Sequence, residues 1–228
     1  MLRFFTNLCI TFGLIKYFIK LFNDLNDLSE QNYKVPELDL GCSKLTITKS
    51  WYTLNIVKWI GITGSWRHTT KELKQDVKRE VAIVLARGDG IVTGGALGVD
   101  YLATEVTINL NPSLSCLKIF LPTDLMSYAA HYNKRAHEGV ITVSQAKKLV
   151  QQLKLVQKTR PGALIEGKQG QAINQASYYA RNRLVAIASD ELLAFQVNNS
   201  PGTSYTVEVA HQLGKRVALF SYKKSIPN

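Results

Sequence analysis

One stretch decides the fold class: Thr93-Gly94-Gly95-Ala96-Leu97-Gly98-Val99-Asp100. It follows a short apolar run, 90–93, and leads into 99–110, which has the composition of a helix. Glycine has no Cβ, so it permits a positive φ and allows a backbone N–H to approach another group closely. A buried strand, a glycine-rich turn and a helix in this order are typical of α/β proteins that bind phosphate groups at the turn.

The same alternation continues on both sides of this stretch. Apolar runs predict strands at 56–63, 90–93, 115–121, 191–197 and 216–222, with an edge strand at 44–48. Apolar residues at helical spacing predict helices at 70–87, 99–110, 173–189 and 203–213. Strands that alternate with helices form a parallel sheet with crossover connections. We therefore expect an α/β, Rossmann-like, mostly parallel sheet with helices on both faces.

The chain is predicted to have three segments. Residues 1–22 form an apolar N-terminal helix, 23–43 a polar linker, and 44–228 the Rossmann-like domain. Within the domain, about 124–171 is predicted to be a helical insertion, with helices at 125–138 and 144–158 followed by a loop.

The N-terminal segment has three interpretations. Its longest uncharged run, 4–15, is shorter than the roughly 20 residues that cross a bilayer. It is a helix docked on the domain or on a partner, a marginal membrane anchor, or an unstructured or misassigned start. We accordingly expect a cytoplasmic protein, with membrane association through residues 1–22 as the alternative.

The charge distribution favours an anionic partner. The chain carries 28 Lys and Arg against 17 Asp and Glu, and the span 134–183 has ten basic residues against two acidic ones. Such a surplus suits phosphates, although it is also what a solvated basic surface looks like. The histidines and cysteines show no HExxH or CxxC spacing, so we predict no metal.

Glycine- and serine-containing turns follow several of the predicted strands. Gly64 and Ser65 follow the first, Gly94 and Gly95 the second, and the run 200–204 the strand at 191–197. The carboxyl ends of parallel strands meet at one sheet edge, where helix N-termini offer unpaired N–H groups. The turns thus predict an anion-binding crevice. Neither GxGxxG nor a Walker motif occurs, so we predict no dinucleotide cofactor, and none of another kind.

Four segments in this order, 61–69, 92–105, 178–195 and 200–220, resemble the successive motifs of the SLOG superfamily. This superfamily includes DNA-processing protein A (the Smf family) and the LOG-type phosphoribohydrolases. The resemblance implies a Rossmann-like fold whose turns bind nucleotide phosphates or single-stranded DNA. It also implies these nucleotide- or phosphate-binding residues: Gly64, Ser65, Arg67, Gly94, Gly95, Gly98, Asp100, Arg181, Asn182, Gly202, Thr203, Ser204 and Glu208.

Departures from the motifs decide between the branches. The phosphoribohydrolases resemble one another in PGGxGTxxE, whereas this chain has SPGTSYTVE and a more distant Glu208. We therefore expect a nucleotide- or single-stranded-DNA-binding protein close to DNA-processing protein A, without catalytic residues. The alternatives are a phosphoribohydrolase with Glu208 as its catalytic acid, and a sensor of a small nucleotide. A homodimer is a further partner hypothesis.

Tyrosines provide the remaining candidate contacts to a nucleic acid. Tyr178 and Tyr179, together with Tyr128 and Tyr132 in the predicted insertion, have rings on which bases could stack. Aromatic residues at helical spacing more often belong to the core, and the sequence leaves both interpretations open for all four.

Overall fold

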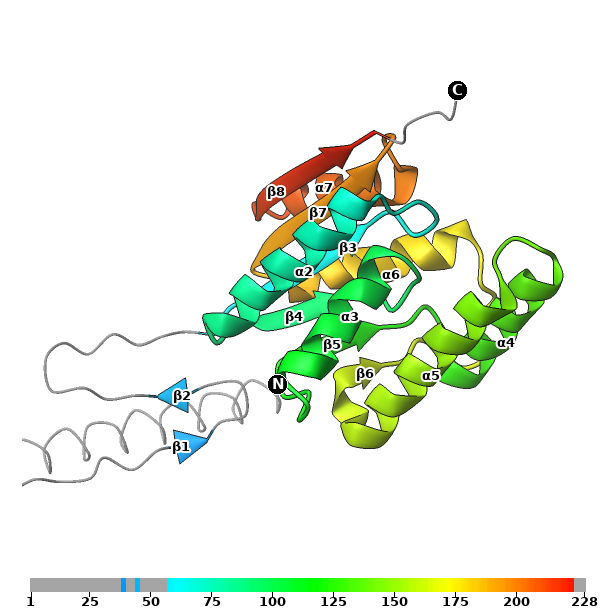
Figure 1. Cartoon of the computed structure of the whole chain (residues 1–228), viewed down its shortest axis with the longest axis horizontal. Helices are drawn as coiled ribbons and strands as arrows, with labels where there is room; N and C mark the ends of the chain where they lie inside the picture. The colour runs from blue at the N-terminus through cyan, green and yellow to red at the C-terminus, as the bar shows by residue number, and fades with distance from the viewer. Residues whose placement is uncertain (1–37, 40–43, 46–56, 224–228) are drawn as a thin grey trace, which may run out of the picture. The chain divides into compact units, whose positions relative to one another are not determined.

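The computed structural model describes residues 57–223 and two short strands, and Figure 1 shows its elements. The short strands, β1 (Leu38–Asp39) and β2 (Lys44–Leu45), pair antiparallel. The other strands are β3 (Trp59–Gly64), β4 (Gly90–Thr93), β5 (Leu117–Phe120), β6 (Leu164–Ile165), β7 (Glu191–Val197) and β8 (Arg216–Tyr222). The helices are α2 (Lys71–Ala86), α3 (Val99–Leu110), α4 (Leu125–His137), α5 (Val143–Thr159), α6 (Gln175–Ala188) and α7 (Pro201–Gln212), with a 3-10 turn η1 (Pro161–Ala163).

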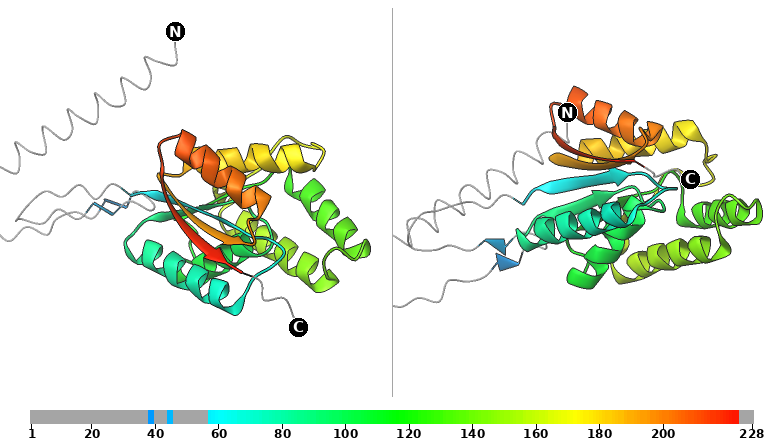
Figure 2. Two further views of the ribbon diagram at one scale, coloured as in Figure 1. Left: turned by 90° about the horizontal axis from the view of Figure 1, so that it is seen from above. Right: turned by 45° about the horizontal axis from the view of Figure 1, so that its top comes forward.

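Strands β3 to β8 form one parallel sheet in the order β6-β5-β4-β3-β7-β8. Figure 2 shows α2 and α3 on one face of the sheet and α6 and α7 on the other. This arrangement confirms the predicted Rossmann-like α/β fold. The chain leaves β3 first toward β4 and later returns to its other side as β7, so the strand order reverses between β3 and β7. Ligands of open α/β sheets bind at such a reversal.

The core of the sheet is made of the apolar residues that the strand patterns place inside. Ile60, Ile62, Ile91, Ile119 and Phe195 are each 1% exposed or less. Helix α2 adds its four buried residues, Leu73, Val77, Val81 and Val84, which are among those predicted from its spacing. Its first turn is capped by Thr70, whose hydroxyl accepts a hydrogen bond from the backbone N–H of Leu73.

The segment predicted as a helical insertion contains the helix pair α4 and α5, and α5 opens on a capping box at Thr142 and Gln145. Apolar residues of both helices, among them Tyr128 and Leu149, belong to the main core cluster. The loop predicted after α5 differs from expectation, because it contains η1 and the edge strand β6, which pairs with β5. A two-residue strand is too short to show a period in the sequence.

Several predictions about the N-terminal part lie outside the described residues. These are the helix at 1–22, most of the linker at 23–43 and the end of the edge strand at 44–48, of which β2 is the described part. Among the helices that the structure describes, none combines the length and the apolar character needed to cross a membrane.

Gly98 is the glycine whose substitution should cost most stability. It precedes α3 with a φ of +73°, and an added Cβ would run into the backbone of Ser65 and Trp66. Gly139 has a similar φ of +70° but open space around it, so it separates backbone strain from the steric clash. We expect Gly139→Ala to lower the free energy of unfolding by about 1 kcal/mol and Gly98→Ala by more than about 3 kcal/mol. Urea denaturation followed by circular dichroism measures both, and equal effects would contradict the assigned clash.

Candidate functional site

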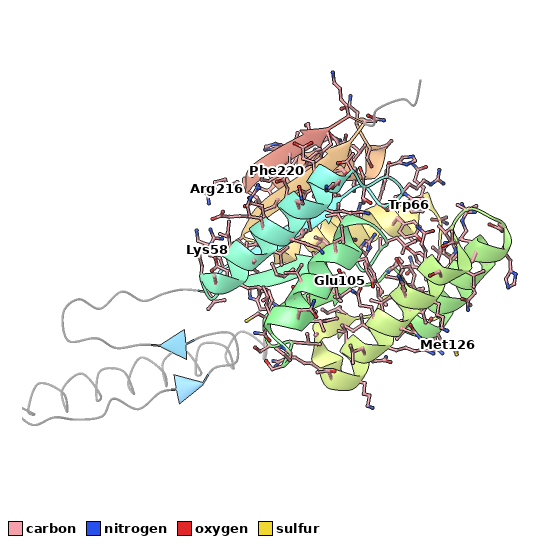
Figure 3. All side chains as sticks on the ribbon, viewed as in Figure 1. Lys58, Trp66, Glu105, Met126, Arg216 and Phe220 are labelled. Carbon is pink, nitrogen blue, oxygen red and sulfur yellow. The ribbon has the colours of Figure 1, made fainter. Side chains whose placement is uncertain are left out.

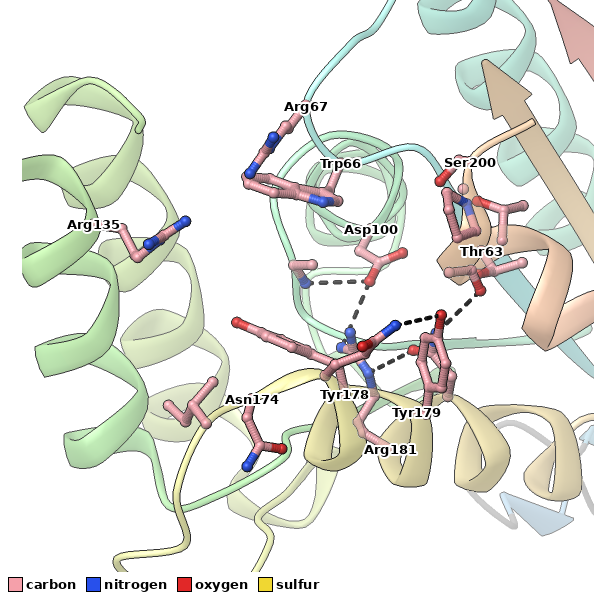
Figure 4. Close-up of a pocket in the computed structure, with 18 of the residues that line it drawn as sticks. Thr63, Trp66, Arg67, Asp100, Arg135, Asn174, Tyr178, Tyr179, Arg181 and Ser200 are labelled. Carbon is pink, nitrogen blue, oxygen red and sulfur yellow. Dashed lines mark hydrogen bonds and ion pairs between the residues drawn. The ribbon is translucent and has the colours of Figure 1, made fainter. Parts of the chain in front are cut away.

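A pocket of about 580 Å³ opens at the carboxyl ends of β3 and β7, where the strand order reverses. Strands β3 and β7 pair from Ile60 with Glu191 to Gly64 with Phe195, so the two strands end side by side. The pocket is lined from five regions: the end of β3 with its following loop, the start of α3, helix α4, helix α6 and the start of α7. Figure 4 shows this arrangement.

The buried pair of Asp100 and Arg181 lies in the floor of the pocket (Figure 4). Asp100 comes from the first turn of α3 and is 7% exposed, whereas Arg181 comes from α6 and is 5% exposed. The Nη1 atom of Arg181 lies 3.8 Å from Oδ2 of Asp100, which also accepts a hydrogen bond of 3.2 Å from the N–H of Ala96. At 3.8 Å the two groups form an ion pair but no hydrogen bond.

Gly94 makes room for this guanidinium. A Cβ at Gly94 would overlap with three atoms of the Arg181 guanidinium group, so the side chain lies directly against the glycine backbone. On its other side, Arg181 donates from Nε to Oδ1 of Asn182 at 2.9 Å, and Asn182 donates from Nδ2 to the carbonyl of Gly202 at 3.3 Å. The arginine therefore connects the turn after β4 with helix α6 and the start of α7.

Arg181 has a buried donor without a partner. Among the described residues, Nη1 is buried and has no hydrogen-bond partner, and the same is true of the hydroxyl of Thr203 at 1% exposure. Both residues line the pocket. Buried polar groups without partners cost free energy, so a ligand or an ordered water that reaches these two would stabilise the site. Thr203 lies in the first turn of α7, where the N–H groups of Thr203 and Ser204 already donate to the carbonyl of Ser200, so the helix dipole is what this turn offers to an anion.

Burial sets the protonation behaviour of Asp100. Desolvation raises the pKa of this carboxyl above its ordinary value, and the charge of Arg181 opposes that rise. The ionised pair has no net charge, so the positive potential at the pocket depends on other groups. Arg67 supplies it at the rim, where it is exposed with its guanidinium 4.4 Å from the centre of the Trp66 ring. On α4, Arg135 and Lys134 share Glu138 at 2.8 and 3.9 Å, so these three side chains together keep one positive charge.

Helices α4 and α6 close one side of the pocket. Nε2 of His131 on α4 lies 3.3 Å from the hydroxyl of Tyr178 on α6. Burial, together with the nearby charges of Arg135 and Lys134, lowers the pKa of His131, against the opposing effect of Glu138. The imidazole is therefore neutral at neutral pH and contributes hydrogen bonding but no charge to this wall.

A sequence model of the family described as DNA recombination-mediator protein A matches residues 50–226. The chain belongs to this family.

The fold is shared with a solved structure of the family. DNA processing protein A from Helicobacter pylori, whose structure concerns a single-stranded DNA binding mode, has 24% identity and a TM-score of 0.51 over 71% of this chain and 64% of that chain. DNA processing protein A from Streptococcus pneumoniae has 19% identity and a TM-score of 0.48 over 75% and 52%, respectively. This chain thus spans less than two thirds of either relative's length. A search of curated proteins found no match.

Seven of the thirteen predicted site residues line the pocket. They are Gly64, Arg67, Asp100, Arg181, Asn182, Gly202 and Thr203. Three more belong to the turn after β4: Gly94 contacts Arg181, Gly95 faces Leu121 and Ile119, and Gly98 faces the loop after β3. The three others do not line the pocket: Ser65, Ser204 and Glu208.

Hydrogen bonds explain these three positions. The hydroxyl of Ser65 is buried and accepts from the N–H of Val197 at 2.8 Å, which ties β3 to β7. Ser204 accepts from Gln196 at 2.7 Å, and Glu208 is exposed on α7, where it accepts from Gln212 at 3.3 Å. Glu208 is therefore not placed to act on a molecule in the pocket.

Sequence reasoning missed much of the wall. Trp66, Arg135, Asn174 and Gln175 line the pocket and had not been singled out. A signal existed for Arg135, which lies in the basic span 134–183, and for Asn174, whose side chain caps α6. Within the described part of the chain, no group of three or more His, Cys, Asp or Glu residues could hold a metal ion.

Replacement of Arg181 by Met should expose the role of the buried pair. Without the guanidinium, the pKa of Asp100 rises further above its ordinary value of 3.8. When folding raises the pKa of a carboxyl, the free energy of unfolding of the protein falls as pH increases from the unfolded-state pKa to the folded-state pKa. We therefore expect Arg181→Met to be nearly as stable as the wild type at pH 4 and less stable by about 3 kcal/mol at pH 8.

Urea denaturation across this pH range provides the measurement. The double variant Arg181→Met/Asp100→Asn is the control, because it has no carboxyl to titrate. Its difference from the wild type should depend much less on pH. A stability loss in Arg181→Met that stays constant from pH 4 to pH 8 would contradict the pairing.

Proposed function

We propose that this chain binds single-stranded DNA and that a backbone phosphate occupies the pocket between β3 and β7. The observation that carries the proposal is the guanidinium of Arg181, a residue that lines the pocket and whose buried Nη1 atom has no hydrogen-bond partner among the described residues. Phosphate oxygens accept hydrogen bonds from guanidinium groups, often from two nitrogens at once. The hydroxyl of Thr203 adds a donor from a second element, α7.

The rim supplies the charge that the buried pair lacks. Arg67 on the loop after β3 and Arg135 on α4 both line the pocket, and Lys134 lies beside Arg135. Cations at both sides of a pocket suit an extended polyanion whose successive phosphates leave the pocket in two directions. The family of the chain and the single-stranded DNA binding mode of the Helicobacter pylori protein support the same ligand.

Salt dependence tests the proposal. For single strands, the logarithm of the binding constant falls with the logarithm of the salt concentration by about 0.7 for each phosphate neutralised. We expect fluorescence anisotropy with a labelled oligothymidylate to give a steep slope. Arg67→Ala and Arg135→Ala should each weaken binding by about two- to fivefold and reduce the slope by about 0.7.

Arg87→Ala is the matched control. Arg87 is the C-cap of α2, about 24 Å along the helix from the loop that follows β3. Its loss should leave both affinity and slope unchanged. A flat salt dependence of the wild type, or an equal effect of Arg87→Ala and Arg67→Ala, would contradict phosphate binding at the pocket.

Glu208→Ala separates this function from nucleotide hydrolysis. Glu208 is exposed and does not line the pocket, so we expect its removal to leave the affinity for single-stranded DNA within about twofold of the wild type. Chromatography of nucleoside monophosphates incubated with the wild type should show no released base. Base release that disappears in Glu208→Ala would instead identify a phosphoribohydrolase.

A further inference from the structure

Two stacked tyrosines lie beside the pocket. Tyr179 on α6 and Tyr205 on α7 have ring centres 4.3 Å apart and ring planes within 8° of parallel. Both side chains are partly exposed. Figure 3 shows all described side chains on the ribbon, and Figure 4 shows Tyr179 on the same helix as Arg181. The pair therefore joins α6 and α7 close to the start of α7, where Thr203 lies.

Only one face of the Tyr179 ring is available to a ligand. Tyr179 lines the pocket, whereas Tyr205 does not. Tyr205 covers one face of the Tyr179 ring, so the surface that Tyr179 offers to the pocket is its other face and its edge. Gln175, which also lines the pocket, donates from Nε2 to the hydroxyl of Tyr179 at 3.1 Å. These contacts fix the ring in place before any ligand arrives.

The other tyrosines of this region meet their aromatic neighbours edge to face. Tyr128 and Tyr132 are 0% and 5% exposed, with a centre distance of 5.0 Å, as rings in a core have. Tyr178 lines the pocket, as Tyr132 does, but it contacts His131 edge to face and lies 5.6 Å from the guanidinium carbon of Arg181. Tyr179 differs from them because a parallel ring covers one face of its own ring.

Resting on the proposed function, we propose that Tyr179, backed by Tyr205, is a stacking platform for one base of the bound strand. The phosphate donors Arg181 and Thr203 lie on the same two elements as the two tyrosines, α6 and α7. A nucleotide whose phosphate reaches these donors therefore places its base at the tyrosine pair. Because every base has an aromatic face, the platform accepts all four bases with little preference.

The experiment compares an oligothymidylate with an abasic sugar-phosphate oligomer of the same length, by anisotropy at one salt concentration. The two oligomers share their phosphates and differ only in their bases. We expect the ratio of their affinities for the wild type to fall about tenfold in Tyr179→Ala, because stacking on an aromatic side chain contributes on that order for each base. Tyr179→Leu keeps an apolar side chain against Tyr205 but has no aromatic face, and it should behave like Tyr179→Ala.

Two variants serve as controls. Tyr179→Phe keeps the ring and removes only the hydroxyl that accepts from Gln175, so it should retain the wild-type ratio. Tyr101→Ala removes another partly buried tyrosine, one on α3 that does not line the pocket, and should also retain it. Thermal unfolding confirms that each variant is folded.

The outcomes separate this proposal from the one on which it rests. If the wild type binds the oligothymidylate but Tyr179→Ala keeps the wild-type ratio of the two affinities, the stacking platform is wrong. The proposed phosphate binding is then unaffected. An equal loss in Tyr101→Ala would likewise overturn the platform. A wild type that binds neither oligomer removes the proposed function, and the platform with it.

Discussion

The contact between the Arg181 guanidinium and the backbone of Gly94 is the constraint on which the site depends. It places a long charged side chain in the space that a Cβ would fill, inside the turn between β4 and α3. From there the guanidinium faces Asp100, and through Asn182 it is linked to the carbonyl of Gly202. The turn between β4 and α3 and the start of α7 are thus both connected to helix α6 through a single residue.

For the proposed phosphate ligand, this arrangement separates the groups that supply charge from those that supply geometry. Asp100 offsets the charge of Arg181, so the buried pair contributes directed donors and little net charge. The net positive potential comes instead from Arg67 and Arg135 at the rim, which water and salt screen. Rim charges govern the encounter with a polyanion, whereas the buried donors govern its position. Separate side chains therefore carry the affinity and the geometry of the site.

The sequence predicted the fold well because its signals are local. Glycine turns after apolar runs mark the carboxyl ends of strands, and parallel strands bring these ends together whatever the details of packing. This is why Gly64, Gly94 and Gly202 were predicted at one edge, whereas Asp100 and Arg181 were predicted from the family resemblance. Residues of the α4 wall could not be placed in the same way, since a helix period does not reveal which distant element a helix faces. The hydroxyl of Ser65 also shows this limit, because its bond to Val197 depends on how β3 and β7 align.

The glycine-rich turn therefore serves the site in a way that its sequence does not suggest. Glycines in such turns are expected to bring backbone N–H groups close to a phosphate. Here the space beside Gly94 is filled by Arg181, and the space beside Gly98 by the backbone of Ser65 and Trp66. The turn thus positions other donors in addition to any that its own backbone offers. A larger residue at Gly94 would displace the guanidinium from Asp100 and Asn182, so the requirement for glycine there follows from the protein's own packing, before any ligand is considered.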